Sequence, residues 1–384
     1  MSAAAPAPRR PGLAFAGVFA HTFCGLVAVG AVLPVLPGYV KGPLGYGDFA
    51  VGVVIGCYAI SGLLLRPVAG RFADRRGRKW TALGGSLLLS AGGFLYLAPL
   101  GLAGLIFARL VLGAGEGAVY TAGSAWIVDL APPARRGRVL GLYGLAVWGG
   151  LSVGPLLGSV IHSTAGYDEV WLLAAVLPLV GAVAGAFVGD PFVPRAQAEP
   201  HPLVAPEAVR PGIAVSLAAI GYATVASFVV LLLEKRGVSG GAVVFAAFAG
   251  AIVLARLVLG DLPDRVGPAR VAVGATLAEA AGLLAIAVAG SLPVALLGAV
   301  AMGCGFSVLN PSLMLIVVGR VSESARGAAL GTFTAFFDLG IGIGAPLAGL
   351  AAALVSYEAA FVLASAIAVG SAATIYALQR SMSQ

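Results

Sequence analysis

Residues 70–79 read GRFADRRGRK and separate two long apolar stretches, Phe49–Ala69 and Trp80–Leu100. Six of these ten residues are charged, and five of the six are basic. A stretch of about 20 apolar residues is long enough to cross the hydrocarbon core of a bilayer as a helix. The three segments therefore predict two membrane-spanning helices joined by a short basic turn.

The same pattern continues on both sides of this hairpin and predicts an all-α membrane protein with twelve spans. Of the 384 residues, 60% are apolar and only 10% are charged, whereas soluble domains carry roughly 25% charged residues. The apolar runs do not alternate with polar residues, as the strands of a membrane barrel do. The ten further runs are Leu13–Leu36, Leu102–Val128, Val139–Ile161, Val170–Val188, Ile213–Leu233, Ala242–Leu259, Val271–Ala289, Leu292–Val318, Ala328–Ala352 and Ala359–Leu378.

The distribution of Lys and Arg orients the chain. With the N-terminus in the cytoplasm, 17 of the 23 basic residues fall on the cytoplasmic side, as the positive-inside rule requires. The three on the opposite side are Lys41, Lys235 and Arg236, and the three within helices are Arg66, Arg109 and Arg256. We expect a multi-pass protein of the plasma (inner) membrane with both termini cytoplasmic. The net charge of +7 then reflects topology, and we expect no nucleic-acid partner.

A proline-rich break and an internal repeat divide the chain into two halves. Residues 190–211 contain six prolines and mixed charge, which predicts a cytoplasmic linker. We therefore expect a six-helix bundle at residues 1–189 and a second, pseudo-symmetric one at 212–384. A shift of 190 residues aligns identical residues of the two halves, among them Arg66 with Arg256, Asp74 with Asp264, Arg136 with Arg326 and Gly154 with Gly344.

Three motifs resemble those of the major facilitator superfamily. The first is the basic turn itself, and the second is Arg109-x-x-x-Gly113-x-Gly115. The third resembles the antiporter motif of the twelve-helix drug:proton exporters, with Ser159 in place of its last glycine; its residues are Gly141, Gly150, Gly154, Pro155 and Gly158. The resemblance implies a secondary transporter whose two bundles expose one site alternately to the two sides of the membrane.

The resemblance also implies a latch at the basic turn that holds the two halves in the outward-facing state. Asp74 would cap the helix that begins near Ala328, and Arg78 would pair with Asp129. The alternative is a solvated loop that only fixes orientation. The full set of latch residues is Gly70, Asp74, Arg75, Gly77, Arg78 and Asp129, with the two glycines permitting a tight turn.

The third motif predicts a bend at Pro155 and tight packing of its glycines against a helix of the other half. Glycine lets membrane helices approach closely, so ordinary small-residue packing is the alternative to a role in antiport.

Charged residues within membrane helices are candidates for transport, because each costs at least about 2.5–3.5 kcal/mol at a helix centre. The most informative are charged residues that have no identical counterpart in the other half. The common scaffold requires only residues that both halves share, so an unmatched charge indicates a separate role. The resemblance places the helix of Glu279 at the periphery, which makes that residue the weakest candidate. The unmatched residues are Arg109, Glu116, Glu279 and Asp338, which align with Ala299, Phe306, Leu89 and Trp148.

Glu116 is the first candidate for a proton-carrying carboxylate, because it lies near the middle of its helix. It shares a helix face with Arg109, seven residues earlier, so a structural Glu116–Arg109 pair is the alternative. Asp338 is the second candidate. His21 could relay protons or make a single structural hydrogen bond. Asn310-Pro311 could break its helix and expose backbone groups to substrate, or only kink the helix.

These features predict proton-coupled efflux of a small amphipathic drug or metabolite by a monomer that uses the proton gradient and no cofactor or metal. The chain has no Walker-type loop for ATP. A transporter of the same fold for sugars, amino acids or metallophores, and a lipid flippase, are the alternatives. We do not expect an enzyme, because the sequence contains no HExxH motif, no nucleophile elbow and no clustered His and Asp ligands.

Overall fold

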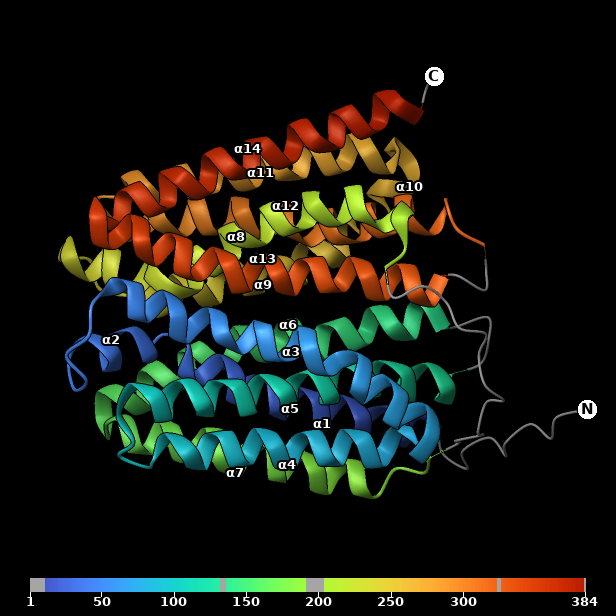
Figure 1. Ribbon diagram of the computed structural model, residues 1–384, viewed down its shortest axis with the longest axis horizontal. Helices are drawn as coiled ribbons and strands as arrows, with labels where there is room; N and C mark the ends of the chain where they lie inside the picture. The colour runs from blue at the N-terminus through green and yellow to red at the C-terminus, as the bar shows by residue number, and fades with distance from the viewer. Residues whose placement is uncertain (1–10, 132–135, 191–203, 323–325, 383–384) are drawn as a thin grey trace, which may run out of the picture. The chain divides into compact units, whose positions relative to one another are not determined.

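A computed structural model describes residues 11–131, 136–190, 204–322 and 326–382, and the regular structure in these ranges is helical (Figure 1). The helices before residue 190 are α1 (Pro11–Val32), α2 (Leu36–Lys41), α3 (Asp48–Arg76), α4 (Arg78–Tyr96), α5 (Gly101–Leu130), α6 (Arg136–Thr164) and α7 (Tyr167–Ala186). Those after residue 204 are α8 (Pro206–Lys235), α9 (Gly241–Leu259), α10 (Leu262–Val266), α11 (Pro268–Val288), α12 (Leu292–Val318), α13 (Arg326–Leu354) and α14 (Tyr357–Met382).

Within the described ranges, eleven helical segments are long and apolar enough to cross a membrane. One of them, Gly12–Lys41, combines α1 and α2. The helix α4 has 19 residues but is not among the eleven; it begins with Arg78 and Lys79 and is rich in glycine and serine. The prediction of an all-helical membrane protein is confirmed, whereas the twelfth span, which α4 would provide, stays a prediction.

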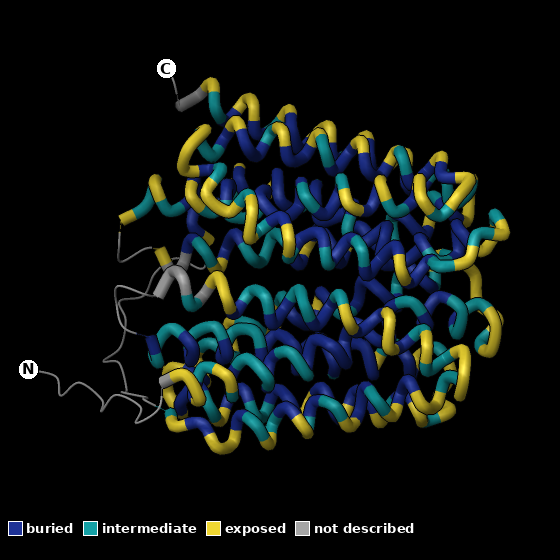
Figure 2. Tube along the Cα trace, turned by 180° about the vertical axis from the view of Figure 1, so that it is seen from behind, coloured by how far each residue is buried: buried dark blue, intermediate teal, exposed yellow. Residues whose placement is uncertain are grey.

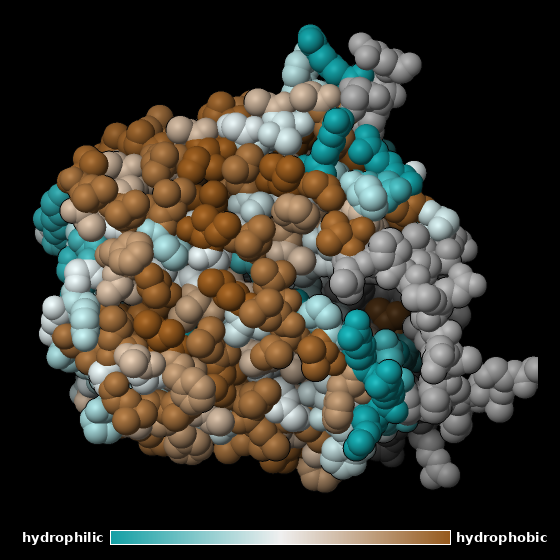
Figure 3. Space-filling view, in the orientation of Figure 1, coloured by the Kyte–Doolittle hydropathy of each residue, from teal (hydrophilic) through white to brown (hydrophobic). Residues whose placement is uncertain are grey.

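Large apolar side chains cover the outside of the helices. Leu64 is 66% exposed, Leu254 66% and Leu297 70%. Figure 3 shows apolar residues over most of the face that it draws, with hydrophilic residues gathered near the helix ends. Soluble proteins rarely expose contiguous apolar patches of this kind, so this surface is suited to lipid.

Contacts divide the chain into two compact units. Unit 1 comprises Met1–Val35 and Ile60–Ala198, and unit 2 comprises Leu36–Ala59 and Glu199–Gln384. The helix α2 and the first part of α3 therefore belong to unit 2, although they come early in the sequence. The bundles expected at 1–189 and 212–384 stay a prediction. Part of the expected linker is helical, since α8 begins at Pro206.

Helix boundaries and pairings follow the offset of the sequence repeat. The helices α4, α6 and α7 have counterparts that begin 190 residues later, namely α11, α13 and α14. In unit 1, α1 packs on α6 and α7, and α4 packs on α5 and α7. In unit 2, α8 packs on α13 and α14, and α11 packs on α12 and α14. The same pairing recurs in each unit, and a symmetry axis between the units stays a prediction.

Small side chains form much of the core of each unit. Along α14, buried residues recur every three or four positions, and Ala364, Ala368 and Ala372 lie on this buried stripe (Figure 2). Lipid provides no hydrophobic drive for helix association, so close backbone approach between small residues has to supply the packing.

Candidate functional site

Glu116 and Arg66 form an ion pair inside unit 1. Glu116 lies in the middle of α5, and Nη2 of Arg66, on α3, lies 3.1 Å from its Oε2. The guanidinium group of Arg66 also lies over the ring of Tyr120, 5.0 Å from the centroid. Gly117 makes room for this arrangement, since a Cβ there would lie 3.3 Å from Cγ of Arg66. A half-buried cation is thus held by a carboxylate and a ring face, both favourable partners.

Two further side chains extend this pair into a network. The Tyr143 ring on α6 lies 6.3 Å from the Tyr120 ring, between centroids. Thr22 on α1 donates a hydrogen bond to Oη of Tyr143 over 3.2 Å. Four helices of unit 1 therefore contribute to what we call the Glu116 network, which consists of Thr22, Arg66, Glu116, Tyr120 and Tyr143.

The two other transport candidates of unit 1, Arg109 and His21, are also buried. Arg109 on α5 is 1% exposed, and His21 on α1 is fully buried. Nε2 of His21 lies 3.5 Å from Oγ of Ser86 on α4. A Cβ on Gly185 of α7 would lie 3.1 Å from Nδ1 of His21, so that glycine leaves space for the ring. The ion pair of Glu116 with Arg66 was not expected, because Arg66 had a matched counterpart and lay near the helix end.

In unit 2 the position that matches Glu116 carries an aromatic ring. Phe306 on α12 lies beside three other aromatic side chains, with centroid distances of 6.1 Å to Tyr222, 5.9 Å to Phe248 and 6.0 Å to Phe337. Phe245 completes the group, 6.2 Å from Tyr222. We call this set the Phe306 cluster. Matched positions of the repeat thus carry an ionic network in one unit and a group of aromatic rings in the other.

Asp338 on α13 is 3% exposed, and Asn310 on α12 is half-buried. Of the two alternatives at Asn310-Pro311, the break is wrong, because α12 continues as a helix from Leu292 to Val318, and the kink stays a prediction. A proline removes the backbone bond to the carbonyl four residues earlier, here that of Ser307. Arg256 on α9 donates a hydrogen bond to this carbonyl over 3.0 Å, which allows the helix to continue.

The basic turn is shorter than expected. The helix α3 continues to Arg76 and α4 begins at Arg78, so Gly77, with φ +106°, is the turn. Gly70 lies inside α3 and is not part of a turn. The helix extends because Arg75 and Arg76 in its last turn interact favourably with the negative end of the helix dipole.

The structure contains the Arg78–Asp129 ion pair that the resemblance implies. Nε of Arg78 lies 3.1 Å from Asp129 on α5, and its Nη1 lies 2.8 Å from Asp74 on α3. The backbone N–H of Lys79 donates to Asp190 over 3.1 Å. Burial raises the pKa of the Asp190 carboxyl, against the lowering effect of that N–H. These contacts join three helix ends of unit 1.

The glycines of the third motif pack against α1, a helix of the same half, and the expected partner in the other half is wrong for them. A Cβ on Gly150 would lie 2.8 Å from Cβ of Leu26, and one on Gly154 would lie 2.5 Å from the carbonyl oxygen of Val27. Gly158 approaches the backbone of Ala31, and Pro155 lies beside Gly30. Gly141 has open space around its Cα.

The same packing recurs in unit 2, where Gly340 and Gly344 of α13 meet Ser216 and Ile220 of α8. Matched glycines bring matched helices together in both units, as ordinary small-residue packing predicts, and a role of the third motif in antiport stays a prediction.

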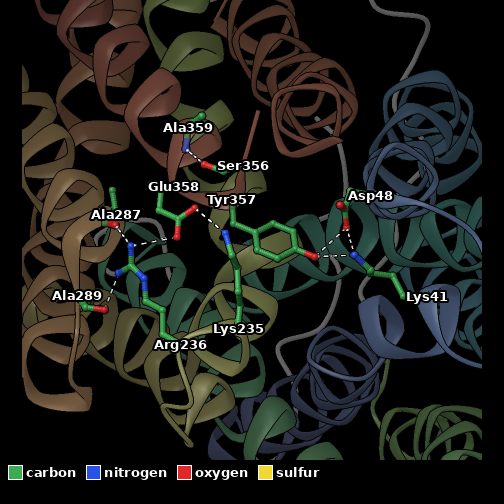
Figure 4. Close-up of polar contacts among 10 residues, drawn as sticks. All are labelled: Lys41, Asp48, Lys235, Arg236, Ala287, Ala289, Ser356, Tyr357, Glu358 and Ala359. Atoms are coloured by element: carbon green, nitrogen blue, oxygen red, sulfur yellow. Dashed lines mark hydrogen bonds and ion pairs between the residues drawn. The ribbon is translucent and has the colours of Figure 1, made fainter. Parts of the chain in front are cut away.

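A polar cluster in unit 2 was not predicted (Figure 4). Nζ of Lys41 at the end of α2 donates hydrogen bonds to Asp48 over 2.5 Å and to Oη of Tyr357 over 2.6 Å. Tyr357, the first residue of α14, donates to the same carboxylate over 3.0 Å. Lys235 lies over the Tyr357 ring, 5.8 Å from its centroid.

The next residue, Glu358, extends the cluster. It accepts from Lys235 over 3.2 Å and from Arg236 over 3.3 Å, and Arg236 also donates to the carbonyl groups of Ala287 and Ala289. Lys41, Lys235 and Arg236, the three basic residues expected on the non-cytoplasmic side, therefore lie in one cluster. Their expected location on the same side of the membrane was the signal in the sequence that could have indicated this. We call this the α14 cluster: Lys41, Asp48, Lys235, Arg236, Tyr357 and Glu358.

Among the described residues, no group of three His, Cys, Asp or Glu side chains is arranged to hold a metal ion. The sequence profile of the Major Facilitator Superfamily matches residues 18–243 and 212–381. The chain belongs to the Major Facilitator Superfamily. It is therefore a membrane transporter of a small-molecule substrate rather than an enzyme.

Curated relatives agree with this membership. An uncharacterised MFS-type transporter of Salmonella typhimurium is 35% identical over 373 residues, which cover 94% of this chain and 96% of the relative. An MFS-type transporter of Pseudomonas aeruginosa is 34% identical over 379 residues, which cover 96% of this chain and 94% of the relative. The drug:proton branch of the superfamily stays a prediction.

Solved structures share the fold of this superfamily member. The nucleoside transporter NupG covers 95% of this chain and 99% of its own with a TM-score of 0.82 at 14% identity. The match to the human organic anion transporter MFSD10 covers 96% of this chain and 100% of that transporter, with a TM-score of 0.74 at 17% identity. The likeness to these structures is one of fold.

Proposed function

We propose that this transporter couples the export of a small amphipathic drug or metabolite to the proton gradient, by alternating access in the plasma membrane. Both termini would lie in the cytoplasm and the chain would act as a monomer. Transporters of sugars, amino acids or metallophores, and lipid flippases, are the rival substrate classes.

The observation that carries the proposal is the Arg66–Glu116 ion pair at mid-helix. Protonation of Glu116 would remove its charge and release Arg66, which could then interact with substrate. Conversely, a bound substrate could take the place of the proton. A carboxylate that binds either proton or substrate gives obligatory exchange, because the two ligands are linked through one group. Asp338 is the second candidate for this role.

The Phe306 cluster supports an amphipathic substrate. Five aromatic side chains within ring-contact distances offer faces and edges that bind apolar or ring-bearing compounds. A sugar site would instead need many hydrogen-bonding side chains. Half-buried Tyr222 and Phe337 are the members that a substrate could reach.

Two polar clusters would control the alternation. The contacts of Arg78 with Asp74 and Asp129 support a latch at the basic turn. Within unit 2, the α14 cluster fastens the early segment Leu36–Ala59 to α14, and we propose that it opens when the other side of the transporter closes.

The proposal is tested in proteoliposomes that contain the purified protein and an imposed pH gradient. A panel of amphipathic dyes, drugs, sugars, amino acids and nucleosides is offered as substrates. We expect gradient-driven accumulation of one or more amphipathic compounds. Accumulation that does not depend on the gradient would remove the coupling claim, and accumulation of only sugars or amino acids would assign the rival class.

Glu116→Gln provides the test at the site. The amide keeps the shape of the side chain but cannot lose or gain the proton, so gradient-driven transport should be lost while counterflow exchange remains. The matched control is Glu169→Gln in the exposed first turn of α7, which should behave like the wild type. Full activity of Glu116→Gln would transfer the proton to Asp338 or another group.

A further inference from the structure

Glu279 lies in the middle of α11, on a helix expected at the periphery, yet its side chain is fully buried in unit 2. Neither carboxylate oxygen has a hydrogen-bond partner among the described residues. A buried carboxylate without a partner is among the most unfavourable groups in a folded protein, and in the membrane a mid-helix charge is a marker of function.

The packing around Glu279 is built to hold its side chain. A Cβ on Gly221 of α8 would lie 2.5 Å from Oε1 of Glu279, so this glycine vacates the space that the carboxyl fills. Gly305 of α12 brings its backbone close to α11, and a Cβ there would lie 3.2 Å from the backbone nitrogen of Glu279. The carboxyl is thus enclosed by α8 and α12.

The repeat shows that this packing does not require a carboxyl. Leu89 of α4 occupies the matched position in unit 1 and is 1% exposed. It lies next to Gly115, the counterpart of Gly305, in the same helix contact. Since an apolar side chain fills the position well in one unit, the acid in the other is not explained by the scaffold.

Glu279 lies in the middle of its helix, whereas the other charged groups on the long helices around it lie near helix ends. Those on α8, α11 and α14 lie within five residues of a helix end, α12 carries none, and α10 is a short segment before α11. They are Glu207, Arg210, Glu234 and Lys235 on α8, Asp264 and Arg265 on α10, Arg270 on α11, and Glu358 and Arg380 on α14. The further titratable side chains are Tyr222 on α8, which belongs to the Phe306 cluster, Cys304 on α12, and Tyr357 and Tyr376 on α14.

We propose that Glu279 is a proton-binding residue of the transport cycle. In the buried arrangement the carboxyl holds a proton, because neither carboxylate oxygen has a hydrogen-bond partner among the described residues that would compensate a negative charge. When α8 moves away at Gly221 and water reaches the carboxyl, the proton leaves to that water and the carboxylate is hydrated. The inference rests on the proton coupling proposed above and adds a site in unit 2 to the one in unit 1.

The proton itself is followed by infrared difference spectroscopy of the full chain in proteoliposomes, between acidic and alkaline pH. We expect a carbonyl band of a protonated carboxyl that is present in the wild type and absent in Glu279→Gln. Glu207→Gln, at the exposed start of α8, is the matched control and should retain the band. A band that is unchanged in Glu279→Gln would overturn the proposal.

Transport gives the second readout, with the compound that the wild type accumulates best. Glu279→Leu introduces the residue of the matched position, and Glu279→Gln keeps the shape; Glu279→Gln decides if the leucine variant does not fold. Both should exchange substrate, but their accumulation should fall to the wild-type level measured after a protonophore has collapsed the gradient. Wild-type accumulation in either folded variant would overturn the coupling role.

The two proposals fail in different ways. A wild type whose accumulation ignores the gradient would overturn the proposed function and the coupling role of Glu279 together. The infrared comparison would still decide whether Glu279 binds the proton.

Discussion

Arg66 and Arg256 occupy matched positions in the two units, and their guanidinium groups have different partners. Arg66 pairs with Glu116, whereas Arg256 donates to the backbone carbonyl of Ser307. That carbonyl lacks its usual helix partner because Pro311 has no N–H group. In membrane helices, neighbouring groups have to satisfy backbone atoms that a proline leaves free. The same residue type thus serves a candidate site in one unit and the scaffold in the other.

We predict that Arg256→Met destabilises the protein by about 1.5–3 kcal/mol, the usual contribution of a hydrogen bond to a charged group. In a Pro311→Ala background the same change should have a smaller effect, because alanine restores the backbone bond to Ser307. Unfolding in detergent, followed by temperature or denaturant, measures the two differences. Equal effects of Arg256→Met in both backgrounds would contradict this role of the arginine.

At the scale of helices, close glycine contacts set the pairings α1–α6 and α8–α13. A Cβ on Gly154 would lie 2.5 Å from the carbonyl oxygen of Val27, and one on Gly344 would lie 2.8 Å from Cα of Ile220. Both distances are too short for an unaltered helix contact. Backbone atoms cannot move aside as the end of a flexible side chain can, so a substitution has to separate the helices.

Gly154→Ala and Gly344→Ala should therefore both lower thermal stability. The controls are Gly141→Ala and Gly331→Ala, since these matched glycines have open space around them. Alanine there should be neutral or stabilising by roughly 0.5–1 kcal/mol, because glycine is unfavourable inside a helix. If Gly154→Ala instead abolished coupling with unchanged stability while Gly344→Ala had no effect, the result would support a role of the third motif in antiport.

The α14 cluster connects α2 and the start of α3 to α14 through few but well-placed polar atoms. Lys41 is the central donor, because it binds both Asp48 and Tyr357. Lys235 is 52% exposed at its side chain, and exposed ion pairs contribute only about 0–1 kcal/mol. The attachment of α2 and the start of α3 to α14 therefore depends more on Lys41 than on Lys235.

Lys41→Met should increase hydrogen exchange of the backbone amides in residues 36–59, whereas Lys235→Met should change it much less. Mass spectrometry of the protein in nanodiscs provides the measurement. Equal protection of residues 36–59 in the wild type and Lys41→Met would show that apolar packing, such as that of Gly52 and Gly56 against α13, holds the segment without the cluster.

At the scale of the whole molecule, the number of membrane crossings depends on α4. It is a helix of 19 residues with charged residues at its start, and 19 residues rise about 28 Å at 1.5 Å each, close to the thickness of the hydrocarbon core. Its glycines, its serines and the two basic residues at its start lower its mean hydropathy, but α5 and α7 pack against it within unit 1. Burial against neighbours compensates for a less apolar helix.

Single cysteines at Arg76 and Leu100, in a variant without Cys24, Cys57 and Cys304, test this crossing. Both positions are exposed and flank α4. If α4 spans the membrane, an impermeant maleimide added to intact cells should label only the cysteine at position 100, and labelling of position 76 should require lysis. Labelling of both from one side would leave eleven crossings and would contradict the twelve-helix prediction.

Much of the helix arrangement could be predicted from the chain alone. Eleven spans follow from apolar runs of sufficient length, and the offset of 190 residues anticipates which helices correspond. These features are local, since a helix satisfies its own backbone hydrogen bonds and the bilayer selects for length and apolarity. The end of α3 was less predictable, because arginines that suggest a loop also stabilise the last turn of a helix.

The partners of the buried charges were decided only by the tertiary structure. Glu116 shares a helix face with Arg109, and the structure adds an ion pair with Arg66, on another helix. Lys41 and Tyr357 are separated by 316 positions in the chain. Helices that are apolar all round carry no amphipathic stripe to indicate which side meets which neighbour. Composition alone therefore determines that such helices cross the bilayer, while packing in three dimensions determines which polar groups meet.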